Sequence, residues 1–151
     1  MKPTRLPLLL GLAVLAGLVV YLLTSAFYGD LPPLPLYSPI FLVVLAAAEA
    51  YTAATTAARL AGRPGTQPIH PLTVARIAAL AKATSPVGAL AAGAYIGVLV
   101  YVAQVPGPHA RADLRTSIVG VAAAVLLTVA ALAMERVCRV KTPKEPPAED
   151  R

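Results

Sequence analysis

Long apolar blocks constrain this chain more than any other feature. Four of them cover about residues 6–27, 40–60, 86–105 and 117–134, and Glu49 is the one charge near the middle of a block. A soluble helix interrupts its apolar face every turn, whereas a run of about 20 apolar residues matches the hydrocarbon thickness of a bilayer. Because lipid offers the backbone no hydrogen-bond partner, such blocks form helices. We expect an all-α membrane protein whose four transmembrane helices form a bundle.

Composition leaves little material for anything else. Charged residues make up 13% of the 151 residues, against about a quarter in an ordinary soluble domain. We therefore expect a single membrane domain over residues 1–151 and no soluble domain. Cys138 is the only cysteine, which excludes an intramolecular disulfide and a two-cysteine metal site.

Basic residues alternate between the segments that separate the blocks. Of the 13 Lys and Arg residues, only Arg111 and Arg115 lie between the third and fourth blocks, and none lies between the first and second. The other basic residues precede the first block, lie between the second and third, or follow the fourth. The positive-inside rule then places both termini in the cytoplasm, in the inner (cytoplasmic) membrane.

Two other interpretations of these features are weaker. A cleaved signal peptide has an apolar region of about 7–15 residues, which is shorter than the first block. The net charge of +6 could suggest nucleic-acid binding, but the charges flank membrane spans. Contact with the bilayer and its anionic lipid headgroups explains them, so we expect no nucleic-acid partner.

The segments between blocks have distinct characters. "YGDLPPLPLYSP" at 28–39 is rich in proline and predicts a short, stiff hairpin between the first two spans. The cytoplasmic loop at about 61–85 contains Pro71, which suits the first turn of a helix. The helical pattern that follows either lies along the interface or extends the third span, with a kink at Pro86. We expect the tail at about 141–151 to be disordered.

Glu49 is the main candidate for a functional site. Thr52 and Thr56 share its helix face, whereas Tyr51 points about 200° away by the helical period. Three interpretations stay open: a structural ion pair with Lys82 or Arg76, a protonated and hydrogen-bonded acid, or a carboxylate that binds a cation or relays protons.

Other candidate sites are less specific. Gly93 and Gly97 form a GxxxG pattern that permits close helix packing. Arg63, His70 and Arg76 could form a cytoplasmic basic patch for an anion, although contact with lipid headgroups is the better explanation for them. The chain has no catalytic, phosphate-binding or dinucleotide motif, and we expect no metal site and no cofactor.

Three segments carry a resemblance to a known family: "YGDLPPLP" (28–35), "RPGTQPIHPLTVARIAALAKA" (63–83) and "ERVCR" (135–139). With them the chain resembles small, alanine-rich, four-span membrane proteins of actinobacteria that are catalogued as a domain of unknown function. The resemblance covers nearly the whole chain. It implies signature positions at Arg63, Pro64, His70, Pro71, Arg76, Lys82 and Glu49, while Gln67 and Val137 depart from the family pattern.

These observations favour a non-enzymatic accessory or scaffold subunit that forms a homo-oligomer or binds another membrane protein. The alternative is a small oligomeric carrier or proton-coupled transporter of an anionic solute, in which Glu49 couples the proton. A membrane enzyme that acts on lipid is a third possibility, but the sequence offers no nucleophile–base pair for it.

Overall fold

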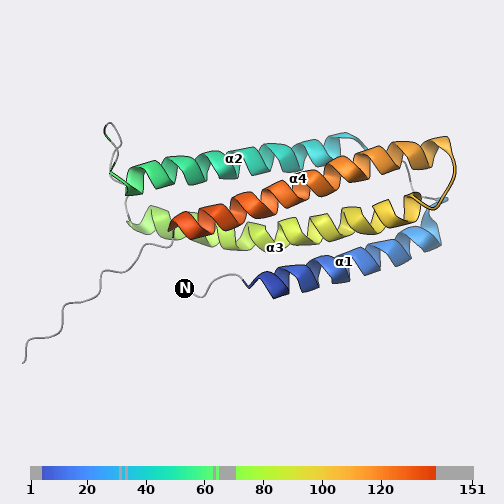
Figure 1. The fold of residues 1–151 in the computed structure, drawn as a ribbon, viewed down its shortest axis with the longest axis horizontal. Helices are drawn as coiled ribbons and strands as arrows, with labels where there is room; N and C mark the ends of the chain where they lie inside the picture. The colour runs from blue at the N-terminus through green and yellow to red at the C-terminus, as the bar shows by residue number, and fades with distance from the viewer. Residues whose placement is uncertain (1–4, 31, 33, 63, 65–70, 139–151) are drawn as a thin grey trace, which may run out of the picture.

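The computed structural model describes residues 5–30, 32, 34–62, 64 and 71–138. Within these residues it contains four helices, which are α1 (Leu6–Phe27), α2 (Tyr37–Leu60), α3 (Pro71–Val102) and α4 (Pro108–Cys138). All four are long and apolar enough to cross a membrane. The prediction of an all-α protein with four transmembrane helices is confirmed (Figure 1).

Three helices are longer than the apolar blocks that predicted them. Helix α1 has the predicted bounds, but α2 begins at Tyr37 instead of residue 40, and α4 covers Pro108–Cys138 instead of 117–134. The largest difference is in α3, which begins at Pro71 and ends at Val102, so that residues 71–85 extend the third span. Hydropathy detects only the part of a helix that meets hydrocarbon, whereas helical hydrogen bonding continues into polar turns. The predicted tail at 141–151 lies outside the described residues.

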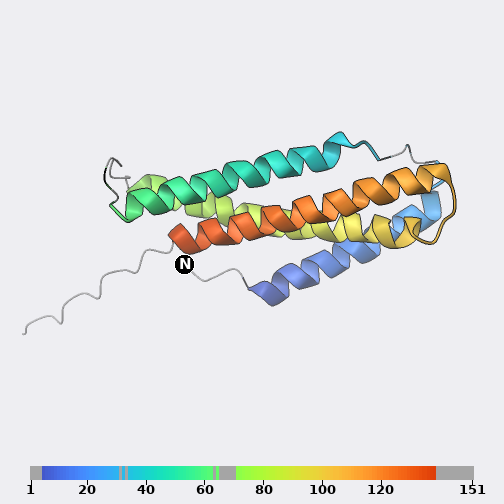
Figure 2. The ribbon, with the colours of Figure 1, turned by 45° about the horizontal axis from the view of Figure 1, so that its top comes forward.

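The packing order of the helices differs from their order in the chain. Helices α3 and α4 form the central pair, α1 packs against α3, and α2 packs against α4. Figures 1 and 2 show α1 and α2 at opposite edges of this arrangement. The prediction of a hairpin between the first two spans is therefore wrong. The segment between α1 and α2 crosses the end of the molecule that is opposite to the chain termini.

Helices α1 and α3 are in backbone contact at glycine. A Cβ atom on Gly93 would overlap the carbonyl group of Ala13, and one on Gly97 would overlap the carbonyl group of Gly17. A Cβ on Gly17 would in turn lie 3.0 Å from the carbonyl oxygen of Gly93. Small residues favour such contacts because helices in lipid gain no hydrophobic energy from meeting each other. The GxxxG pattern thus packs α1 onto α3.

Helices α3 and α4 are the most enclosed of the four. The inner face of α4 is built from small and apolar residues. Those that are almost inaccessible are Ala123, Ala124, Leu127, Ala131 and Met134. Two further glycine contacts join α4 to α3, since Gly120 lies against the ring of Tyr95 and Gly88 lies against Thr128. Nearer the chain termini, Ala53 of α2, Ala81 of α3 and Met134 of α4 form one apolar cluster.

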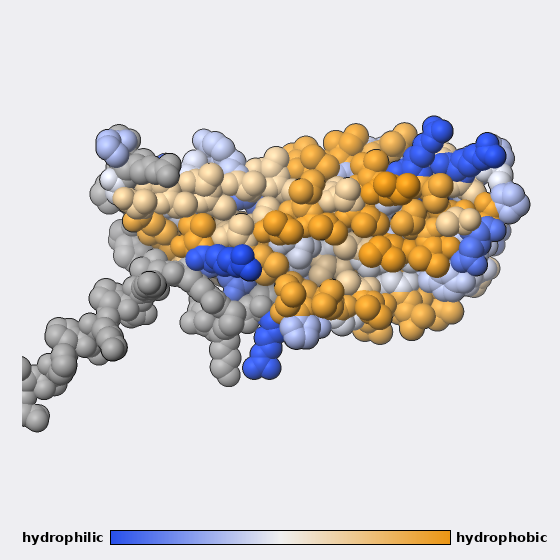
Figure 3. All heavy atoms as spheres, viewed as in Figure 1, coloured by the Kyte–Doolittle hydropathy of each residue, from blue (hydrophilic) through white to orange (hydrophobic). Residues whose placement is uncertain are grey.

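The outer surface is apolar along most of its length. Large apolar side chains are exposed on all four helices, most densely on α1. Figure 3 shows hydrophobic residues over the middle of the molecule and strongly hydrophilic ones toward its two ends. Because a soluble protein rarely exposes apolar patches of more than a few hundred Å², this surface belongs in a lipid bilayer.

Glycine substitutions test the contact between α1 and α3. We expect Gly93→Ala to lower the free energy of unfolding by about 1–3 kcal/mol, because the new methyl group forces the two backbones apart. Gly11→Ala on the open side of α1, where nothing lies within 4 Å of a new Cβ, should be neutral or stabilising. Thermal unfolding of both variants in one detergent measures the difference, and equal stability would contradict the contact.

Candidate functional site

Glu49 lies inside the helix bundle. Its side chain is 4% exposed, and Ala53 and Thr56 are buried on the same face of α2. Thr52, which also shares this face, is half-buried and donates its hydroxyl hydrogen to the carbonyl oxygen of Ala48 at 2.7 Å. The Ala53–Ala81–Met134 cluster lies about one helical turn away toward the chain termini. A carboxyl group therefore stands where α2, α3 and α4 meet.

The structure brings Glu49 together with Thr84, and not with Lys82. The side chain of Thr84 on α3 is in hydrogen-bonding contact with the Glu49 carboxyl group. Lys82 and Arg76 are exposed on α3, and across the described part of the chain no basic side chain acts on Glu49. One carboxyl oxygen, Oε2, is buried and has no hydrogen-bond partner among those residues. The ion-pair interpretation thus loses both cations that the sequence suggested.

Next to Thr84, helix α3 continues through a proline. Pro86 has no backbone N–H, so the carbonyl oxygen of Lys82 loses its helical partner. The buried Ser85 hydroxyl donates to that carbonyl oxygen at 3.5 Å, and Thr84 donates to the carbonyl oxygen of Leu80 at 3.1 Å. Hydroxyl groups often satisfy freed carbonyls in membrane helices in this way. The segment that faces Glu49 is therefore one where the backbone ladder is interrupted.

The structure describes only one of the three residues of the predicted basic patch. Arg63 and His70 lie outside the described residues, and Arg76 is exposed near the first turns of α3. A patch formed by the three residues stays a prediction. Among the described residues, no group of three or more His, Cys, Asp or Glu side chains could hold a metal ion.

A second polar site, which the sequence analysis missed, lies at the opposite end of the molecule. Asp113 of α4 is 3% exposed. Its Oδ2 accepts a hydrogen bond from the hydroxyl group of Tyr28 at 2.8 Å, and its Oδ1 accepts one from the backbone N–H of Leu34 at 2.8 Å. Both donors belong to the segment between α1 and α2. Asp113 therefore holds this crossing segment against α4.

Aromatic packing surrounds the Asp113 site. The rings of Tyr28 and Tyr101 meet edge to face with centroids 5.1 Å apart, and Tyr21 meets Tyr101 at 6.3 Å. Burial raises the pKa of Tyr28 from 10.0 to about 12, and the hydrogen bond to Asp113 acts in the same direction. The phenol group thus keeps the hydrogen that it donates to Asp113 throughout the physiological pH range.

A periodic signal could have revealed Asp113. Ala110, Asp113, Ser117 and Gly120 recur every three or four residues and are all buried. The apolar-block criterion began the fourth span at residue 117, which left Asp113 in a loop. A second link at this end is also absent from the sequence analysis, since the hydroxyl groups of Ser38 and Tyr95 lie 2.8 Å apart and join α2 to α3.

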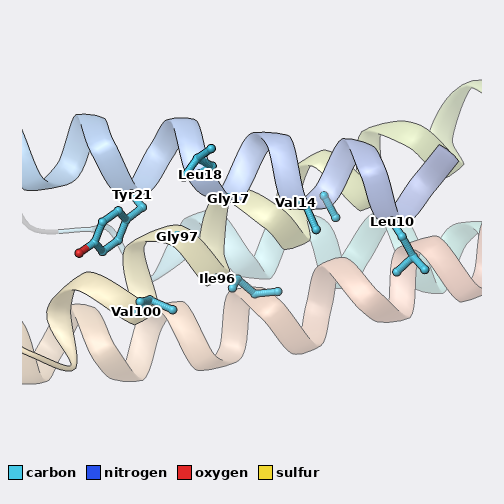
Figure 4. Close-up of a pocket in the computed structure, with 9 residues that line it drawn as sticks. Leu10, Val14, Gly17, Leu18, Tyr21, Ile96, Gly97 and Val100 are labelled. Atoms are coloured by element: carbon cyan, nitrogen blue, oxygen red, sulfur yellow. The ribbon is translucent and has the colours of Figure 1, made fainter. Parts of the chain in front are cut away.

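An apolar groove lies between α1 and α3. It has a volume of about 460 Å³, and the view in Figure 4 shows Leu10, Val14, Leu18 and Tyr21 of α1 with Ile96 and Val100 of α3 along its sides. Gly17 and Gly97, where the two backbones touch, also line the groove. This lining offers no acid, base or nucleophile apart from the Tyr21 hydroxyl group.

Removing the Asp113 carboxylate tests the link across the helix ends. We expect Asp113→Ala to lower the free energy of unfolding by about 2–4 kcal/mol, because the Tyr28 O–H and the Leu34 N–H both lose their acceptor. Tyr28→Phe removes only one of the two bonds and should cost about 1–2 kcal/mol. Chemical or thermal unfolding in detergent compares the two variants. An Asp113→Ala variant no less stable than Tyr28→Phe would show that Asp113 does not hold the crossing segment.

Comparison with known proteins gives a family but no activity. No curated protein and no solved structure matches the chain. The model of a family described as "Protein of unknown function (DUF3180)" matches residues 9–142, which include all of α2, α3 and α4 and most of α1. The chain is thus a multi-pass membrane protein that belongs to the DUF3180 family.

Proposed function

We propose that this protein is a non-enzymatic accessory or scaffold subunit of a membrane complex, and that it binds its partner through one face of α2. This face, the α2 outer face, consists of Ala47, Tyr51, Ala54 and Ala58. The observation that carries the proposal is Tyr51, which is 73% exposed near the middle of the helix.

The α2 outer face has the composition of a helix contact. Its residues are spaced by four, three and four positions, so they form one stripe opposite Glu49. Ala47 and Ala54 are exposed and Ala58 is half-exposed. By contrast, α1 exposes large residues such as Leu15 and Leu18. Alanine stripes let two helix backbones approach closely, and within the chain the glycine contacts of α3 already work in that way.

Tyr51 adds an independent reason for a protein partner. It is nine residues from Leu60 and fourteen from Tyr37, the two ends of α2, or about 14 Å and 21 Å along the helix. Helical side chains tilt toward the helix N-terminus, so the hydroxyl group points away from the nearer end. A phenol hydroxyl at this depth would have no hydrogen-bond partner in hydrocarbon. A membrane-spanning helix with a polar group at the same depth would supply one.

The proposal also includes an orientation of the protein in the membrane and contacts with lipid headgroups. The basic residues Arg59, Arg76 and Arg136 belong to the end of the molecule that carries the termini. Their positive charge supports a cytoplasmic location for this end in the cytoplasmic membrane, where anionic headgroups would contact them.

A larger side chain on the α2 outer face tests the accessory role. We expect Ala54→Leu to reduce recovery of the bound partner from native membranes by at least about tenfold, because the added side chain separates the helices. Ala122→Leu is the matched control, since Ala122 is exposed on α4 beside large apolar residues. Affinity purification in a mild detergent, followed by mass spectrometry and size measurement, identifies either another protein or a second copy. Equal recovery with both variants would refute docking through α2.

Glu49 favours a second candidate function, a proton-coupled carrier of an anionic solute. Glu49 has a buried carboxyl oxygen without a hydrogen-bond partner among the described residues, and carboxyl groups inside membrane spans mark proton pathways in transporters. In this case Glu49→Gln should abolish uptake driven by a pH gradient into liposomes that contain the purified protein. Thr55→Val, which removes a hydroxyl group elsewhere on α2, should leave uptake unchanged. Uptake that Glu49→Gln does not reduce would remove this candidate.

A further inference from the structure

Among the described residues, the surroundings of Glu49 contain no cation that would balance a negative charge. On α3, Thr84 faces the carboxyl group, while Lys82 and Arg76 are exposed. On α4, Met134 packs against Ala53, one helical turn from Glu49, and is apolar. The half-buried Glu135 has interactions of its own. Within the residues that the structure describes, Glu49 therefore has neither a cation nor a charged neighbour beside it.

The hydrogen bond that Thr84 donates to Leu80 favours a proton on Glu49, whose buried carboxyl group has no cation beside it among the described residues. A threonine hydroxyl has a single hydrogen to donate, and that of Thr84 goes to the carbonyl oxygen of Leu80 at 3.1 Å. Toward Glu49, Thr84 Oγ1 can then act only as an acceptor. A carboxylate also only accepts, whereas a carboxylic acid donates. As long as Thr84 keeps its hydrogen bond to Leu80, the hydrogen bond between the Thr84 and Glu49 side chains therefore needs a proton on Glu49.

We propose that Glu49 is a proton-binding site in which the bound proton joins α2 to α3. The Glu49 O–H donates to Thr84 Oγ1, and Thr84 donates in turn to the Leu80 carbonyl oxygen. Loss of this proton leaves an unpaired carboxylate at the junction of α2, α3 and α4, which weakens the packing of α2 against the other two helices. This inference concerns the isolated chain, so it does not depend on docking through α2 or on transport.

Infrared spectroscopy tests the proposal directly, because a protonated carboxyl group and a carboxylate absorb at different frequencies. At pH 7, the difference spectrum between wild type and Glu49→Gln should contain the C=O stretch of a carboxylic acid. Thr84→Val should shift that band, because the acid loses its acceptor, whereas the control Thr55→Val should not. A difference spectrum that contains only carboxylate bands would overturn the proposal, and an unshifted band in Thr84→Val would overturn the role of Thr84.

Stability as a function of pH gives a second test. Glutamine mimics the neutral acid, so Glu49→Gln should unfold within about 2 °C of wild type at pH 6. At pH 9, wild type should unfold at least about 3 °C below Glu49→Gln, because deprotonation becomes possible only in wild type. If Glu49→Gln is instead much less stable than wild type at both pH values, Glu49 is an ionised partner of a cation, and the proposal is wrong. Should Glu49→Gln not fold, solid-state NMR of carbon-13-labelled glutamate in the wild type distinguishes the same two states.

Discussion

Close contact between helix backbones is the interaction on which the rest of this structure depends. Helices in lipid gain nothing from hiding apolar surface from each other, so small residues must let them approach. Helix α3 makes such contacts on two sides, with α1 through Gly93 and Gly97 and with α4 through Gly88 and Tyr95. These contacts place α3 and α4 in the centre and α1 and α2 at the edges. The chain must then cross the helix ends between α1 and α2, and the Asp113 carboxylate holds that crossing.

The polar groups inside the spans divide into two kinds. Most are used within the fold, as the Ser38–Tyr95 pair and the hydroxyl group of Thr128, which donates to a backbone carbonyl of its own helix, illustrate. Glu49 and Ser117 differ, because Glu49 Oε2 and Ser117 Oγ are buried and have no hydrogen-bond partner in the described part of the chain. Tyr51 is exposed instead of buried, and its hydroxyl group lies where lipid offers no hydrogen bond. Helix α2 therefore carries Glu49 and Tyr51 on opposite faces, and the internal packing explains neither of them.

The sequence predicted the parts of the fold that depend on hydropathy. Four spans, the bounds of α1 and the use of Gly93 and Gly97 in helix packing follow from apolar length and small-residue spacing. Helix adjacency could not be predicted in this way, because the contact between α1 and α3 depends on which faces fit together. For the same reason the sequence suggested Lys82 as the partner of Glu49, although Thr84, two residues further along α3, lies on the face that meets it. Asp113 was missed because its helical turn lies beyond the apolar block.

The proposed function requires that α2 present a protein-binding face to the membrane. Site-specific photo-crosslinking in native membranes tests it most directly, with a photoreactive amino acid in place of Tyr51 and, for comparison, in place of Leu15, which is 59% exposed on α1. We expect a discrete protein adduct, to another subunit or to a second copy, from position 51 and only lipid adducts from position 15. Lipid adducts alone from both positions would contradict it.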